Sequence, residues 1–414
     1  MLWNSVHGRV GLSGFLWRDR SLAAGFAPLL LVLAGPYAIL ERAETLLVIQ
    51  SLAVAACAFP LARLARRELT NPSLAHALVL AQAAYLPMRV AARCDFQPAL
   101  LAAPLLLECF VSFREGRIRR GAWAWGGALA CGPLVVPAAC SLGIYVALVL
   151  RRGRLGVMLV CLSLGWLAAL TLLAGSAEPS NPWFVGLAPS APMIILVALA
   201  PLAFLPLLAP THAMLALPSV VLAAMYASTG RGGTDGGHLA VAAPMLLVAA
   251  TFGARKLIER DDLRTLLAFY PTVAELERYV AGLLLLGAVV FIGWSPVAEL
   301  RLASGRASID RRQVLAGVPE DALVSAQANL AAHLARRAHV AVFPDRLAPW
   351  IVLDGGRWSG FGASAGRLVS VGRHGYESPP AVWWTPREGR WCGSTVALRP
   401  CRRSRPSTAA AERW

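Results

Sequence analysis

Residues 45–62 have the sequence TLLVIQSLAVAACAFPLA, which contains no charged side chain and ends directly before Arg63. A helix needs roughly 20 mostly apolar residues to cross the hydrocarbon core of a bilayer. Windows of the same character recur along the chain and are separated by short arginine clusters. We therefore predict eight membrane crossings, near residues 45–62, 74–92, 96–113, 155–174, 192–208, 211–226, 238–254 and 279–297.

Two further apolar stretches do not fit a simple crossing. Residues 22–40 are interrupted by Pro28, Gly35 and Pro36, and residues 121–150 are too long for one span and are interrupted at Gly132 and Pro133. Either stretch is interpreted as a re-entrant or split element, because proline and glycine interrupt helices. The expected fold class is an α-helical polytopic membrane protein with about 8–11 membrane helices, followed by a small C-terminal extracytoplasmic α/β domain.

The composition excludes an ordinary soluble protein. Hydrophobic residues make up 57% of the chain and charged residues 15%, and the mean hydropathy is +0.58. A soluble chain of this length would expose too much apolar surface, so the bilayer is the natural solvent. The formal charge of +16 comes largely from arginines at span ends, such as Arg63, Arg66 and Arg67. These are topology signals rather than a nucleic-acid-binding stripe, and no nucleic-acid partner is expected.

The basic turns also predict an orientation in the cell membrane. Turns rich in Lys and Arg lie on the cytoplasmic side, so residues 63–72, 114–120, 151–154 and 255–264 are expected there. This scheme requires residues 121–150 to enter the membrane and return. It sends the chain after the last span to the extracytoplasmic side. Four regions follow: an outer-face loop and juxtamembrane hairpin (1–44), a multi-pass domain (45–298), a small α/β domain (299–355) and a Gly/Arg/Trp-rich tail with a disordered end (356–414).

Strand and helix patterns alternate in the predicted α/β domain. Apolar runs indicate strands at residues 323–326, 340–343 and 350–353, and helix-like runs lie at 311–315 and 330–336. After about residue 355 the periodicity fades.

Acidic residues are scarce at the predicted outer face, and Asp95 is the best candidate for a general base there. It opens the window 96–113 and stands near Arg89 and Arg93. A carboxylate at a helix start also caps free backbone N–H groups and pairs with arginine, so a purely structural role stays open.

Two further titratable residues are candidates. His238 follows a glycine-rich loop and begins an apolar window next to Asp235, which suits substrate binding or proton handling, although interfacial histidines commonly only satisfy their own hydrogen bonds. Glu108 lies inside a window and is a functional candidate on that ground, or it reaches the arginine cluster that starts at Arg114. The eight cysteines form no CxxC or Cys/His cluster, so no metal site is predicted.

The segment VPEDALVSAQANLAAHLARR (Val318–Arg337), followed by Val342-Phe-Pro and Ile351-Val-Leu-Asp354, resembles a bacterial membrane-protein family called domain of unknown function 2079. Upstream matches extend the resemblance over most of residues 1–354. They include Leu2-Trp-Asn4, Pro36-Tyr37, Glu44-Thr-Leu-Leu-Val-Ile-Gln50, Asp95-Phe96, Pro201-Leu-Ala-Phe-Leu-Pro206 and His238.

That family is similar to the GT-C membrane glycosyltransferases, which take sugars from polyprenyl-phosphate donors at the outer face. The resemblance implies lipid-linked sugar transfer, with membrane lipids and a polyprenyl-phosphate sugar as partners. The cofactor is unknown, and a divalent cation is expected only if the protein is catalytic. The implied catalytic residues are Asp95 and His238, and the implied substrate-binding residues are Arg89, Arg93, Asn329 and His333.

The sequence departs from the family pattern at several positions. An acidic motif and a span are expected ahead of Trp3, Gly25 and Gln97 stand where the family has histidine, and Gly132-Pro-Leu134 replaces a Lys-Glu-Asp motif. The chain is therefore expected to be truncated at its amino terminus or degenerate. Three interpretations stay open: a glycosyltransferase, active or disabled; a non-catalytic membrane scaffold or partner-binding protein; and, ranked last, a transporter.

Overall fold

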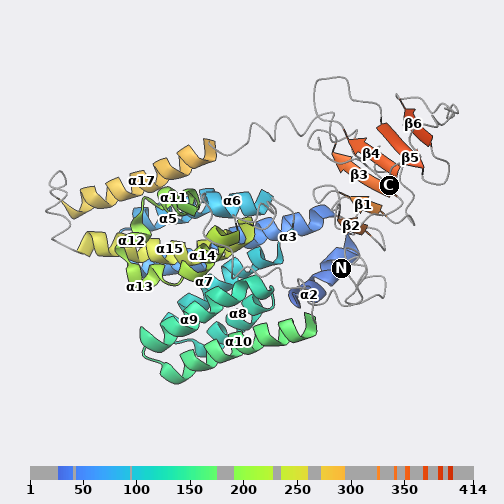
Figure 1. The fold of residues 1–414 in the computed structure, drawn as a ribbon. Helices are drawn as coiled ribbons and strands as arrows, with labels where there is room; N and C mark the ends of the chain where they lie inside the picture. Colours follow the sequence, from blue (N-terminus) through green and yellow to red (C-terminus); the bar gives the residue numbers. More distant parts are fainter. Residues whose placement is uncertain are drawn as a thin grey trace. The chain divides into compact units, whose positions relative to one another are not determined.

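The helices follow the apolar windows of the sequence (Figure 1). In this computed structural model the described residues are 27–40, 43–93, 96–174, 191–226, 235–259 and 272–293, together with six strands between residues 324 and 394. The chain divides into two compact units, a helical unit that extends to Ser295 and a unit that holds the strands. Each unit is described by itself.

Four helical segments in the described part of the chain are long and apolar enough to cross a membrane: Glu44–Glu68, Pro72–Ala92, Gly153–Leu170 and Leu239–Glu259. They coincide with four of the eight predicted windows and confirm the helical membrane class. Their elements are α3 (Ala43–Ala56) with α4 (Ala58–Glu68), α5 (Pro72–Ala84) with α6 (Leu86–Arg93), α10 (Gly153–Ala174) and α15 (Asp235–Glu259).

Prolines explain the interruptions within the first two segments. Pro60 has no amide hydrogen for the carbonyl of Ala56, and α3 ends there, with a turn at Cys57. Pro87 likewise cannot continue the ladder from α5, and the chain is extended at Tyr85 between α5 and α6.

Of the other four windows, 279–297 overlaps the continuous helix α17, and 96–113 forms a short 3-10 helix followed by α7. The windows 192–208 and 211–226 form broken helices, which differs from the single crossings expected there. Prolines at 201, 206, 210 and 218 divide those two windows. Ala203 and Phe204 take left-handed backbone angles (φ 50° and 56°) at the break. The total of 8–11 membrane helices stays a prediction. The elements are η1 (Pro98–Leu101), α7 (Ala102–Arg114), α11 (Ala191–Leu199), η4 (Ala200–Leu202), α12 (Leu205–Leu208), α13 (Pro210–Ala213), α14 (Leu217–Tyr226) and α17 (Val273–Gly293).

The stretch 121–150 is split, as its sequence indicates. Helix α8 (Ile118–Leu129) is followed by a turn at Gly132, where φ is 120°, and then by η2 (Pro133–Val135) and α9 (Val136–Leu148). Only glycine adopts this backbone conformation readily. The described part of 22–40 is the single helix α2 (Leu29–Ile39), which contains Pro36.

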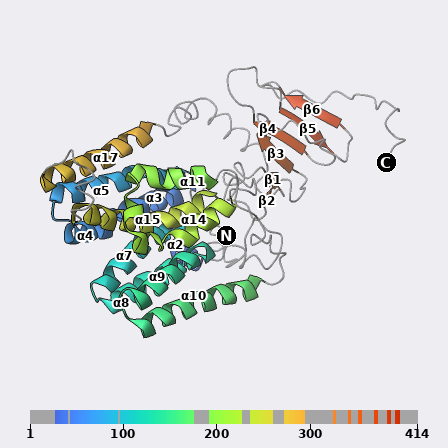
Figure 2. The same ribbon diagram turned by 60° about the vertical axis from the view of Figure 1, so that its left-hand side comes forward.

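Helix α15 is the centre of the helical unit and α10 lies at its margin (Figures 1 and 2). In α15, 83% of the apolar window within Leu239–Glu259 is buried. In α10, only 22% of the apolar window Gly153–Leu170 is buried. Helix α10 packs on α9 where Gly143 and Gly156 allow close backbone approach. Its exposed apolar side chains, such as Val157, Leu162 and Leu164, are suited to contact with lipid.

The strands form two separate groups. A parallel sheet has the order β2-β1-β3-β4, and β5 pairs with β6 in antiparallel fashion. Strands β1 to β3 coincide with the predicted strands, whereas the predicted helices at 311–315 and 330–336 lie outside the described residues, so the α/β domain stays a prediction. Strands β4 to β6 lie in the region where the sequence lost its periodicity. The six strands are Val324–Ala326, Val340–Val342, Trp350–Asp354, Arg367–Val371, Ala381–Thr385 and Arg390–Ser394.

Candidate functional site

Most of the predicted site residues fall where the structure describes no side chain. Asp95, Asn329 and His333 lie outside the described residues. Arg93 ends α6 and His238 lies in the first turn of α15, but only their backbone is described. Arg89 is described in full: its Nη1 donates to the carbonyl of Phe291 at 3.4 Å, which ties α6 to the end of α17.

The backbone brings two predicted regions together. Ala91 precedes Asp95 in the chain and Leu100 follows it, and both are fully buried against Ala240 of α15. Ala240 stands two residues after His238. The packing therefore joins the start of α15 to the link between α6 and η1. Sequence spacing alone could not show this, because the two regions are more than a hundred residues apart.

Gln50 of α3 holds this link. Its side-chain Nε2 lies 3.4 Å from the carbonyl oxygens of Ala91 and of Ala92, and its Oε1 accepts a hydrogen bond from the backbone N–H of Gln97 at 2.7 Å. Gln50 is fully buried. A buried amide costs free energy unless it is hydrogen-bonded, so these contacts account for a polar side chain in an apolar helix. The sequence analysis assigned Gln50 no role. The available signal was an amide side chain in the apolar window 45–62.

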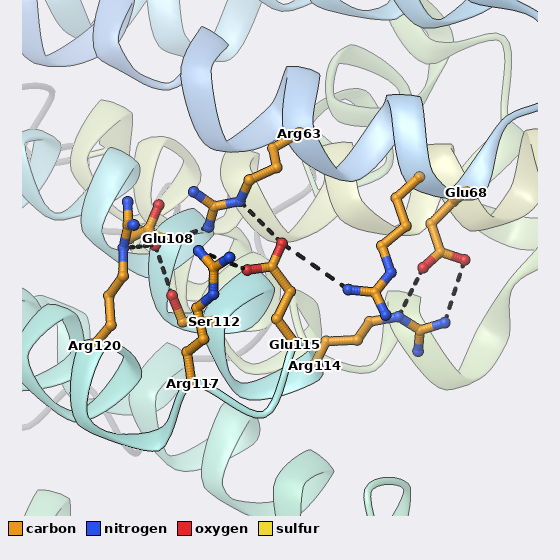
Figure 3. Close-up of polar contacts among 9 residues, drawn as sticks. Arg63, Glu68, Glu108, Ser112, Arg114, Glu115, Arg117 and Arg120 are labelled. Atoms are coloured by element: carbon orange, nitrogen blue, oxygen red, sulfur yellow. Dashed lines mark hydrogen bonds and ion pairs between the residues drawn. The ribbon is translucent and has the colours of Figure 1, made fainter.

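A network of ion pairs joins helices at the opposite end of the unit (Figure 3). The Glu108 carboxylate lies 2.8 Å from Nη2 of Arg63 and 2.6 Å from Nε of Arg120, and it accepts a hydrogen bond from Ser112 at 2.6 Å. Nε of Arg63 also lies 3.1 Å from Glu115. Pairing of Glu108 with the 114–120 cluster confirms one of the two roles predicted for it.

Glu68 is the most buried acid of this network, with a side chain that is 3% exposed. Arg114 donates to both of its oxygens, from Nε at 2.9 Å and from Nη2 at 3.2 Å, and Arg255 donates to Oε2. The three residues come from α4, α7 and α15, so one carboxylate connects three helices. The sequence analysis missed Glu68, because its partners lie 46 and 187 positions away.

Arg114 also rests on an aromatic stack. Its guanidinium carbon lies 4.5 Å from the ring centroid of Phe252, and the rings of Phe252 and His212 stack at 3.8 Å. Nε2 of His212 is 3.1 Å from the hydroxyl of Tyr145. A guanidinium over an aromatic face is electrostatically favourable, so the stack fixes Arg114 from the apolar side while Glu68 fixes it from the polar side. His212 was not singled out from the sequence.

The basic turns gather at the end that holds the ion pairs, as the orientation scheme requires. Thr70 and Asn71, in the turn between α4 and α5, donate to the Glu277 carboxylate near the start of α17 at 3.0 and 2.8 Å. Arg89 meets the other end of α17. The Arg-rich turns and the contact of Ala91 and Leu100 with Ala240 therefore lie at opposite ends of the unit. The assignment of the basic end to the cytoplasm is a prediction from the charge rule.

The described residues contain no group of three or more His, Cys, Asp or Glu side chains arranged to hold a metal ion. The model of one family, described as "Predicted membrane protein (DUF2079)", matches residues 1–188 and 184–349. No curated protein matches the chain, and no solved structure matches it.

Proposed function

The chain belongs to the DUF2079 family of predicted membrane proteins, and from that premise we propose that it transfers a sugar from a polyprenyl-phosphate donor. The proposed site is the end of the helical unit that carries Arg89, Asp95 and His238. One observation carries the proposal: Ala240 packs against Ala91 and Leu100, which supports a shared site for the start of α15 and the link that contains Asp95.

Each proposed residue has a chemical task. Transfer to an acceptor hydroxyl needs a general base, and Asp95 is the proposed base. The departing phosphate carries negative charge, which Arg89 and Arg93 are proposed to stabilise. His238 is proposed to handle a proton or hold the acceptor. The Gln50 contacts support this assignment because they hold the backbone on both sides of Asp95.

The C-terminal region is proposed to lie on the same side of the membrane. A small extracytoplasmic α/β domain over residues 299–355 would bring Asn329 and His333 to the outer face, where we propose that they contact the substrate. The parallel pairing of β1 with β2 and with β3 supports the α/β part of this proposal, because parallel strands need crossover connections that are usually helical.

The test is transfer of labelled sugar from a polyprenyl-phosphate donor by the purified protein in proteoliposomes. Asp95→Ala is expected to abolish transfer that survives in the control Glu178→Ala. Equal activity of the two variants would refute the assignment of Asp95.

A second candidate is a non-catalytic membrane scaffold that binds a partner. One observation favours it: Gly132, Pro133 and Leu134, which replace the Lys-Glu-Asp motif implied by the family resemblance, belong to a packed break in which neighbouring Val135 is fully buried. If the unsubstituted protein transfers no sugar from any polyprenyl-phosphate donor supplied, the scaffold function is supported instead.

A further inference from the structure

A cavity of about 380 Å³ opens beside Glu68, at the end of the helical unit opposite the proposed site. It is lined by Arg67, Glu68, Arg114, Leu150 and Arg255. The cavity is open on one side, and its volume is ample for a phosphate group and part of a headgroup.

The lining carries excess positive charge. Three guanidinium groups and one carboxylate line it, so the formal charge of the lining itself is three minus one, or +2. Just outside the lining, Glu259 pairs with Nε of Arg255 at 2.7 Å. Both oxygens of Glu68 already accept hydrogen bonds, two from Arg114 and one from Arg255, so this carboxylate is paired within the protein. Nη1 of Arg67 forms only a long ion pair with Glu115, at 4.0 Å, which is beyond hydrogen-bond distance.

Two features nearby strengthen the attraction for an anion. The turn that follows Leu150 contributes Arg151, Arg152 and Arg154. Nη1 of Arg152 is buried and has no hydrogen-bond partner in the described structure. A buried, unpaired guanidinium N–H is costly, so the turn favours a negative ligand close by.

We propose that this cavity binds a phosphate-bearing anion, supplied either by an anionic phospholipid headgroup of the adjacent leaflet or by a soluble phosphate compound. Arginine side chains suit phosphate because their planar forks donate two parallel hydrogen bonds. Arg114 is held in place by Glu68 and Phe252, so part of the site is formed before the ligand arrives. Leu150 gives the cavity an apolar wall that suits the hydrocarbon part of a lipid. This site is independent of the proposed sugar transfer.

The chain offers a matched pair of variants for the test. Arg66 and Arg67 are adjacent and exposed on α4, but only Arg67 lines the cavity. Arg67→Gln and Arg66→Gln each remove one positive charge and leave the contacts of Glu68 intact. Because Arg67 is about half exposed, the lost charge-assisted contact is expected to weaken binding about tenfold.

The measurement is the melting temperature of the full-length protein in neutral detergent, titrated with dioleoyl phosphatidylglycerol or with inorganic phosphate. Dioleoylglycerol, which has the same acyl chains and no phosphate, is the ligand control. A ligand that binds the folded state raises the melting temperature. The expected result is stabilisation of the parent and of Arg66→Gln, with about tenfold more ligand needed for Arg67→Gln.

The two titrations distinguish the sources of phosphate. A response to phosphatidylglycerol alone identifies a lipid headgroup, and a response to inorganic phosphate as well identifies a site open to soluble phosphates. The proposal is overturned if dioleoylglycerol stabilises as well as the phospholipid, if neither phosphate ligand stabilises the parent, or if both variants lose the response equally.

Discussion

Substitution of Gly253 by alanine tests the packing of α15 against the broken helix that precedes it. A Cβ atom at this position would lie 1.9 Å from the carbonyl oxygen of Leu205 and 2.7 Å from its carbonyl carbon. Real Cβ atoms do not approach other atoms so closely, and the obstacle is backbone rather than a flexible side chain. Either α12 or the end of α15 must therefore move.

The cost follows from two opposing effects. Overpacking of a tight interior typically costs about 1–3 kcal/mol, and a backbone obstacle places this site near the upper value. Alanine in a helix recovers about 1 kcal/mol relative to glycine. The expected net loss for Gly253→Ala is about 2 kcal/mol. Gly282 of α17 has no atom within 4 Å of an added Cβ, so Gly282→Ala is a matched control that should gain up to about 1 kcal/mol.

The assay is thermal unfolding of the detergent-solubilised protein. Samples are heated to a series of temperatures, and the protein that stays folded is measured by size-exclusion chromatography with fluorescence detection. A difference of about 3 kcal/mol between the two variants corresponds to roughly 6–12 °C in melting temperature for a domain of this size. If Gly253→Ala melts within 1 °C of Gly282→Ala, on the order of the assay's resolution, the close approach of α12 to α15 described above is wrong.

Three further predictions concern the two ends of the helical unit. Glu68→Gln should lower the melting temperature by an amount that corresponds to about 2–3 kcal/mol, because it removes the buried carboxylate that pairs with Arg114, while Arg255 keeps only its contact with Glu259. Glu108→Gln should cost under about 1 kcal/mol, because Glu108 and its partners are more exposed. Equal losses would contradict this ranking. Gln50→Leu should cost about 1–3 kcal/mol through the unsatisfied N–H of Gln97, measured by the same melting assay; no loss would show that the link does not depend on Gln50. A reporter fused after Gly305 should give an extracytoplasmic signal and one inserted at Gly116 a cytoplasmic signal; the opposite pattern would invert the topology.

The membrane class could be predicted because length and apolarity of a window are local properties of the sequence. The four helical segments that are long and apolar enough to cross a membrane lie where windows were expected. The broken course of 192–226 was harder to predict, since Pro201, Pro206 and Pro210 were visible but the windows were still apolar enough for one crossing each. The left-handed angles at Ala203 and Phe204 depend on how α12 packs against α15, which no local pattern records.

The candidate sites also divide into features that depend on local sequence and features that depend on how distant helices pack. The basic turns lie together at one end of the unit, which the charge rule could anticipate because it depends only on which residues flank each window, whereas the cytoplasmic assignment of that end stays a prediction. It could not name Glu68 as the residue that connects three helices, because that role arises only when α4, α7 and α15 meet. The sequence offered one usable signal, an acid directly after Arg66 and Arg67 at a span end. An acid within a cluster of arginines can be stabilised by arginines from several helices at once, as Glu68 is by Arg114 and Arg255. Glu108 and Glu68 differ in this respect. The arginines that pair with Glu108 neutralise an acid within a predicted span, whereas the arginines that pair with Glu68 also line a cavity.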